Sequence, residues 1–291
     1  MIAPKPQREL FTRLKRPPAR RKPAVTIAIG FKCSDGVVLA ADTQITWQDS
    51  HKYYERKLRP HFDETRTWNA TFTFAGDPAL WKSFNEKFRD AMALTQTVPV
   101  TASRIRDVIE TVLQLFDVLH RDPMNLNLLC AVSVPGDTYQ LYKTQGHTIH
   151  EVHGYEYVGC GDSSILRFLG PLLTAPPPVS LMDQHGYIVR QAVTIATYLV
   201  MKAKTYVDGC GGDTDVWAMR PDGAFAVWDQ TKIYKIEQMM LMLEHHMKHV
   251  ATHFFDRRFS DEQLAQTLEF LVSRLKSDHH EFQVPVDRFM L

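Results

Sequence analysis

The sequence predicts an α+β fold, a four-layer αββα sandwich followed by a C-terminal helical extension. Strand signals are numerous enough for two sheets, and two groups of helix signals supply an outer layer for each sheet. The first strands form a strongly apolar hairpin near the N-terminus, around which we expect the other elements to be organised. With 291 residues and a hydrophobic content of 44%, the chain can bury a substantial core.

Thr26 and Asp42 mark the two ends of the predicted hairpin. Residues 27–32 alternate between large apolar and other side chains, which is the period of a strand with one buried face. Residues 37–41 are continuously apolar, as in a strand that is covered on both sides. The Ser-Asp-Gly sequence at 34–36 is a tight-turn signal between them. The hairpin therefore begins with a hydroxyl group and ends with a carboxylate.

The remaining elements follow from local periodicity and turn signals. Asp77 and Pro78 mark the start of a helix, as a cap and a first-turn proline. Residues 46–56 are polar and are expected to form a connection. Further strands are expected at 71–74, 126–134, 139–143, 148–152, 155–161, 216–219 and 224–228, and helices at 78–93, 102–120, 163–173 and 188–203.

We divide the chain into an N-terminal arm at 1–23, a sandwich domain at 24–235 and a helical extension at 236–291. In the extension, Ser260 and Gln263 form a capping-box pattern before an apolar stripe. The extension is expected to pack on its own core or on a neighbouring subunit.

Three histidines of the extension, His245, His249 and His253, recur every fourth residue. This spacing could bind zinc, but no cysteine or carboxylate accompanies them at ligand spacing, and a solvated helix face explains them as well. We therefore expect neither a metal nor a cofactor.

The arm at 1–23 carries eight Lys and Arg residues, one acidic residue and several prolines. Such a composition cannot bury enough apolar area to fold alone. A solvated tail, a propeptide, an organelle-targeting sequence and an arm that docks on an acidic partner all remain open. The arm lacks the apolar stretch of a secretory signal.

The charge and the cysteine pattern restrict the class of protein. The whole chain is nearly neutral, with 34 Lys and Arg against 33 Asp and Glu, so no general case for binding nucleic acid or a membrane follows. No apolar run is long enough to span a membrane. The four cysteines are scattered and lack zinc-type spacing, which fits a reduced, cytoplasmic setting.

The segments Thr26–Gly30 and Asp35–Asp42, together with Lys57, resemble the proteasome β-subunit family of N-terminal-nucleophile (Ntn) hydrolases. Mature chains of that family start Thr-x-x-Val-Gly and continue to Asp-Gly-Val-Val-Leu-Ala-Ala-Asp. The spacing from Thr26 to Asp42 matches this pattern without a gap. The resemblance covers roughly residues 24–235 and implies the αββα sandwich, with Thr26, Asp42 and Lys57 at the catalytic positions.

The chemistry of these three residues is consistent with that assignment. A threonine hydroxyl needs a base, and the α-amine of an N-terminal threonine, which titrates near about pH 7.7–8.0, can serve. The Lys57 ammonium would favour the neutral amine, and Asp42 would hold and balance that lysine. In the chain as encoded, however, 25 residues precede Thr26, so its nitrogen is a peptide nitrogen. Val25 also stands where self-cleaving family members have glycine. Activity is therefore conditional on processing.

The resemblance also suggests supporting residues. Gly76 is the candidate oxyanion donor, because it lies between a strand and a helix N-terminus. Cys160 and Cys210 occupy positions where the family has serines that help to order the active site, and cysteine is the weaker hydrogen-bonding residue. Asp208 lies one residue away from the register of the family's supporting aspartate.

Three functions compete. The first is a cytoplasmic threonine peptidase subunit that acts on proteins or peptides within a homo-oligomeric ring, with an ATP-dependent unfoldase as an optional partner. The second is a non-catalytic structural ring subunit of the same fold, although α-type subunits of this kind usually have glutamate where this chain has Asp42. The third is an Ntn amidohydrolase that acts on a small amide.

Overall fold

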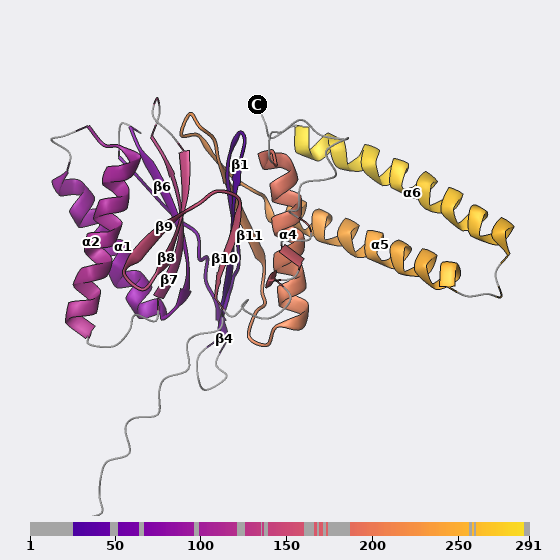
Figure 1. Ribbon diagram of the computed structural model, residues 1–291, viewed down its shortest axis with the longest axis horizontal. Helices are drawn as coiled ribbons and strands as arrows, with labels where there is room; N and C mark the ends of the chain where they lie inside the picture. The colour runs from indigo at the N-terminus through magenta and orange to yellow at the C-terminus, as the bar shows by residue number, and fades with distance from the viewer. Residues whose placement is uncertain are drawn as a thin grey trace, which may run out of the picture.

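The computed structural model describes residues 26–46, 52–63, 67–95, 99–120, 126–134, 136, 139–159, 166–167, 169–170, 173, 187–255, 258 and 260–287, with side chains at 117–120, 255 and 278–287 excepted. These residues confirm the predicted αββα sandwich, in which two antiparallel sheets lie face to face between helices (Figure 1). The arm at 1–23, Cys160 and most of the helix expected at 163–173 fall outside the described residues.

The first sheet contains the predicted hairpin at its centre. Its strand order is β10-β1-β2-β11-β12, and every neighbouring pair is antiparallel. Side chains of β1 and β2 alternate between a core shared with helix α4 and a core shared with the second sheet, as Ile27 and Ala28 do. The strands are β1 (Ile27–Cys33), β2 (Gly36–Asp42), β10 (Tyr155–Gly159), β11 (Thr214–Met219) and β12 (Phe225–Val227).

The second sheet has the order β5-β6-β7-β8-β9 and is also antiparallel. Its strands are β5 (Arg59–Phe62), β6 (Asn69–Gly76), β7 (Leu126–Ser133), β8 (Tyr139–Gln145) and β9 (Thr148–Val152). Within the region expected to be a polar connection, β3 (Gln44–Thr46) pairs with β4 (Lys52–Tyr54), so that expectation was wrong in part. Both strands have three residues, which is too short for a two-residue period to be recognised.

Helices α1 (Pro78–Leu94) and α2 (Ala102–His120) cover the second sheet, and α4 (Val189–Tyr206) covers the first (Figure 1). The predicted start of α1 is confirmed, because the Asp77 side chain accepts a hydrogen bond from the Ala79 N–H at 2.7 Å. Aromatic side chains of α1, including Trp81 and Phe84, pack on Phe72 and Phe74 of β6.

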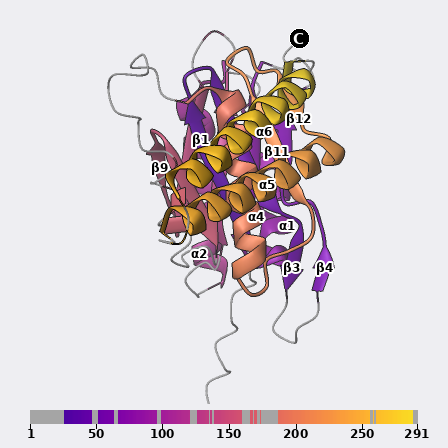
Figure 2. The same ribbon diagram turned by 90° about the vertical axis from the view of Figure 1, so that its right-hand side faces the viewer.

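Helices α5 (Gln230–Phe255) and α6 (Asp261–Asp287) project as a pair from the α4 side of the sandwich (Figure 1), and they cross in front of α4 in the perpendicular view (Figure 2). The boundary expected at residue 235 falls inside α5, whose Ile233 and Ile236 belong to the core shared with α4. The predicted capping box of α6 is present: the Ser260 N–H donates to Gln263 Oε1 at 2.9 Å, and the Gln263 N–H donates to Ser260 Oγ at 3.3 Å.

Two features of the described residues bear on function classes. None of their helices combines the length and apolar character that crossing a membrane requires. Within the same part of the chain, no three His, Cys, Asp or Glu side chains are arranged to hold a metal ion. His253 of the histidine series instead contacts the Thr267 hydroxyl at 3.1 Å.

Candidate active site

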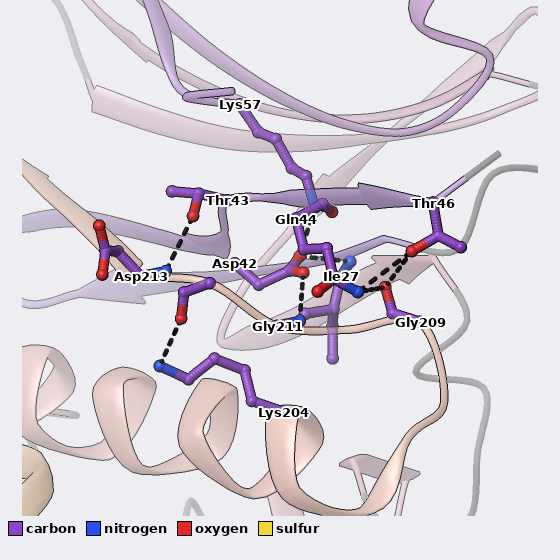
Figure 3. Close-up of polar contacts among 11 residues, drawn as sticks. Ile27, Asp42, Thr43, Gln44, Thr46, Lys57, Lys204, Gly209, Gly211 and Asp213 are labelled. Atoms are coloured by element: carbon purple, nitrogen blue, oxygen red, sulfur yellow. Dashed lines mark hydrogen bonds and ion pairs between the residues drawn. The ribbon is translucent and has the colours of Figure 1, made fainter. Parts of the chain in front are cut away.

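Asp42, the last residue of β2, is the centre of a buried polar cluster (Figure 3). Its Oδ1 accepts a hydrogen bond from the Ile27 N–H at 3.1 Å and a second from Lys57 Nζ, with which it forms an ion pair. Its Oδ2 accepts from the Gly211 N–H at 3.0 Å. The carboxylate thus joins three segments that are far apart in the sequence: the start of β1, the chain before β5 and the turn before β11.

Lys57 reaches Asp42 from the chain between β4 and β5, on the side opposite to helix α4 and its Lys204 (Figure 3). The side chains of Lys57 and Asp42 are both 0% exposed. Lys57 Nζ also donates to the Gln44 carbonyl at 2.6 Å. A buried ammonium is stable only when it is paired and hydrogen-bonded, and here the carboxylate and the carbonyl provide those interactions.

Two opposing effects act on the Asp42 carboxyl. Burial raises its pKa above the ordinary value, because it disfavours the charged form. The Lys57 charge and the N–H groups of Gly211 and Ile27 oppose that rise. All three partners are hydrogen-bond donors, so the arrangement fits a carboxylate that keeps Lys57 in place.

Thr26 lies directly before β1, and it is 0% exposed. The next residue, Ile27, is held at one end by Asp42 and is paired across the sheet with Gly159 of β10. Ala28, two residues after Thr26, belongs to the core shared with the second sheet. The nucleophile predicted from the sequence therefore lies one residue from the Asp42 cluster.

Gly159 brings β10 into close contact with Thr26. It has a φ of +106°, and a Cβ at this position would overlap the Thr26 carbonyl oxygen and lie 3.0 Å from the Cβ of Ala75. Gly76, the candidate oxyanion donor, follows Ala75 at the end of β6 and has a φ of +126°. Glycine at 159 thus lets β10 approach Thr26 closely, with Ala75 of β6 next to the contact.

The turn at 209–213 is bonded to the chain that follows Asp42. The Gln44 N–H donates to the Gly211 carbonyl, and the Thr43 N–H donates to the Asp213 carbonyl, both at 3.0 Å. Side chains reinforce the contact, since the Thr43 hydroxyl accepts from the Asp213 N–H at 2.8 Å and Gln44 Nε2 donates to the Gly209 carbonyl at 2.9 Å. A Cβ at Gly211 would lie 2.6 Å from Gln44 Oε1, so a residue with a side chain there would require the Gln44 amide to shift.

The structure places the other predicted supporting residues less directly. The Cys210 side chain is buried in the core shared with α4, and it is the neighbouring Gly211 that contacts Asp42, through its backbone N–H. Asp208 is exposed at the start of the same turn. Cys160 lies outside the described residues. The backbone donors of Ile27 and Gly211 were missed by sequence reasoning, because a main-chain N–H has no side-chain signal.

Comparisons with known proteins find solved structures of similar fold. Neither a protein-family model nor a curated protein matches the sequence. A mutant Anbu from Hyphomicrobium sp. strain MC1 matches with a TM-score of 0.62 and 12% identity, over 77% of this chain and 96% of that one. A second Anbu structure from that strain matches with a TM-score of 0.58 and 11% identity, over 77% and 97%.

Anbu (ancestral β-subunit) from Yersinia bercovieri matches with a TM-score of 0.57 and 15% identity, over 74% of this chain and 93% of that chain. Matches at this level of identity carry information about the fold, and they span nearly the whole length of the Anbu chains. The resemblance seen in the sequence is thereby confirmed at the level of the fold: over most of its length the chain has the fold of the Anbu (ancestral β-subunit) structures.

Proposed function

We propose that the chain is a threonine-type peptidase subunit in which Thr26 becomes the N-terminal nucleophile after residues 1–25 are removed. The observation that carries the proposal is the fully buried Asp42–Lys57 pair, whose carboxylate also binds the N–H of the residue after Thr26. A buried ion pair is weak evidence for stability alone. Its position at the start of β1, beside a hydroxyl residue, is where such a pair could activate a nucleophile.

The proposed reaction is acyl transfer through the Thr26 hydroxyl. The free α-amine takes the hydroxyl proton as Oγ1 attacks the peptide carbonyl carbon, and the Lys57 ammonium keeps that amine neutral and basic. The oxyanion that forms accepts a hydrogen bond from a backbone donor, for which Gly76 is the candidate. Collapse of the intermediate releases the amine product, which takes up the proton, and water then hydrolyses the ester on Thr26.

The full-length chain does not meet these requirements. Thr26 is completely buried, and its nitrogen is part of the peptide bond to Val25 and has almost no basicity. Removal of residues 1–25 would supply the base. Processing is therefore the step on which the peptidase function depends.

Intact mass of the protein from its native host tests the proposal. A mass that corresponds to residues 26–291, together with hydrolysis of unstructured peptides, is the expected result. Thr26→Ala should abolish hydrolysis. Thr197→Ala, which removes a buried hydroxyl that donates to a carbonyl within α4, should leave hydrolysis intact and serves as the matched control. A full-length mass in active or assembled native material would contradict the proposal.

A non-catalytic structural subunit is the second candidate. It is favoured by two observations: Val25 precedes Thr26, and Thr26 is buried in the full-length chain. On this alternative the basic arm would be retained and would dock on a partner or gate an assembly. A full-length mass and the absence of peptidase activity are what this candidate predicts.

For either candidate we propose that the protein self-associates in the cytoplasm, as a homo-oligomeric ring. The projecting pair α5–α6 supports self-association, because it exposes large apolar side chains that water solvates poorly. These are Leu241, Met242, Met247, Phe254, Leu268, Phe270 and Val272. An ATP-dependent unfoldase would be an optional further partner of the peptidase form.

Light scattering at micromolar concentration tests self-association. We expect a mass of several subunits, and we expect Met247→Glu with Phe270→Glu to lower it, since both side chains are more than half exposed. Leu94→Glu, at the still more exposed C-terminal end of α1, is the control for added charge elsewhere on the surface. A monomeric mass for the unmodified protein would rule out the ring.

A further inference from the structure

Helix α5 of the C-terminal extension contacts the chain that supports Asp42. Glu237, in the second turn of this helix, accepts two hydrogen bonds at its Oε1. One comes from Lys204 Nζ of α4 at 2.7 Å, and the other comes from the Thr214 hydroxyl of β11 at 2.6 Å. Glu237 therefore connects the extension to a helix and a strand of the sandwich.

Both hydrogen-bond partners of Glu237, Lys204 and Thr214, are connected to the surroundings of Asp42. Thr214 is the residue of β11 that lies directly opposite Asp42 in the sheet register. Lys204 Nζ also donates to the Gly212 carbonyl at 3.2 Å, and the preceding residue, Gly211, donates its N–H to Asp42 Oδ2. In Figure 3, Lys204 extends from its helix to the turn that carries Gly211 and Gly209.

Because Lys204 and Glu237 are largely buried, we expect their interaction to contribute more to local stability than a surface ion pair does. The side chains of Lys204 and Glu237 are each 15% exposed. Exposed ion pairs contribute little to stability, whereas a charge-assisted hydrogen bond in a largely buried site contributes clearly more. Loss of Glu237 would also leave the Thr214 hydroxyl and the Lys204 ammonium without their shared acceptor.

We infer that Glu237 is a positioning residue, which fixes the turn at 209–213 and strand β11 so that Asp42 holds Lys57 beside Thr26. The C-terminal extension is then a support of the active site in addition to any role in assembly. The catalytic consequence rests on the proposed function. The structural consequence, which is the ordering of the turn, does not.

The chain provides a matched control on the same two helices. Glu244 of α5 also binds α4, where it pairs with Lys202 and accepts a hydrogen bond from the Tyr198 hydroxyl at 2.5 Å. Both of these partners belong to α4. A variant at Glu244 therefore weakens the α4–α5 contact through helix residues, whereas a variant at Glu237 also acts on the turn and on β11.

Amide hydrogen exchange of the full-length chain is the primary test. In Glu237→Ala we expect the Gly211 amide to exchange about tenfold faster, which corresponds to about 1.4 kcal/mol of local stability. Glu237→Gln should restore part of the protection, because glutamine keeps an acceptor oxygen for Lys204 and Thr214. Glu244→Ala should change the Gly211 rate by less than about twofold. If Glu237→Ala does not fold, Lys204→Met breaks the contact to the Gly212 carbonyl and should also accelerate exchange.

Steady-state kinetics is the second readout. In the processed form, Glu237→Ala should lower kcat by about tenfold and leave KM little changed. The reason is that the affected residues support Asp42 and Lys57 and do not contact the substrate in the proposed reaction. Equal Gly211 exchange rates in Glu237→Ala and Glu244→Ala would overturn the inference, even if both variants have lowered stability. Faster exchange in Glu237→Ala, but no hydrolysis by processed wild-type protein, would instead refute the peptidase function and support the positioning role.

Discussion

Replacing Gly159 by alanine tests how closely β10 packs on Thr26. Gly159 has a φ of +106°, a region that residues with a side chain rarely adopt. An added Cβ would overlap the Thr26 carbonyl oxygen, lie 2.9 Å from the Thr26 carbonyl carbon and lie 3.0 Å from the Cβ of Ala75. The first two neighbours are backbone atoms, which cannot move aside as a flexible side chain would.

The expected cost has two parts. Holding a non-glycine residue at this φ costs about 1–3 kcal/mol. Forcing the neighbouring backbone apart costs about 1–3 kcal/mol more, as in other overpacked interiors. Together these effects predict a loss of about 4 kcal/mol in the free energy of unfolding, or about 8–16 °C in Tm for a chain of this size. A variant that folds should also have Thr26 displaced, and it should fail in hydrolysis by the processed form.

Gly154 provides the control, since it lies in the β9–β10 connection, directly before the strand that ends at Gly159, and an added Cβ there meets no atom within 4 Å. Urea unfolding followed by tryptophan fluorescence should give Gly154→Ala a stability within about 0.5 kcal/mol of the parent. The reasoning would be refuted if Gly159→Ala were destabilised by less than about 1 kcal/mol.

Three further predictions concern one buried pair and two single side chains. Asp42→Asn and Lys57→Met should each lower the free energy of unfolding in urea by about 3–5 kcal/mol, because each change leaves a buried partner uncompensated. The double variant should lower it by clearly less than the sum of the two. Additive losses would show that the pair is not coupled. Burial raises the pKa of Asp215, so the charged form of this carboxyl opposes folding. The free energy of unfolding gained in Asp215→Asn should therefore be largest at neutral pH and should shrink as the pH falls through the carboxyl range. A gain that grows towards acidic pH would contradict this. Ser260→Ala should remove the hydrogen bond that caps the Gln263 N–H and lower the stability of α6 by about 1 kcal/mol. The measurement is amide hydrogen exchange, which should become faster in the first turn of α6. Unchanged exchange there would mean that the cap is not needed.

Elements with strong local signals could be predicted from the sequence. The hairpin at 26–42 has both its apolar pattern and its turn, and it forms with the expected ends. Asp77 and Ser260 carry complete capping signals, and both helices begin next to them. Strand β5 was missed because it has four residues and contains Pro60, which is tolerated in an edge strand but weakens the pattern.

The candidate site was predictable only where side chains carry its chemistry. Asp42 and Lys57 do form a buried pair, as their types and spacing suggested. The Gly211 N–H, in contrast, approaches Asp42 from 169 residues away, and a main-chain donor leaves no mark in the sequence. Glu237 is likewise an ordinary helix residue until the packing of α5 on α4 brings it to Lys204.

The strand order of the first sheet has a consequence for the timing of folding. The hairpin that holds Thr26 and Asp42 is made early in synthesis, yet its neighbours on either side are β10 and β11, which follow more than a hundred residues later. Pairings that close such long loops form slowly, and here they need nearly the whole sandwich domain. The donors around Asp42 therefore come together only after residue 211 has been synthesised and docked. A nascent chain therefore carries Thr26, the proposed nucleophile, long before the groups around Asp42 are in place, and any self-cleavage would be delayed until the domain is complete.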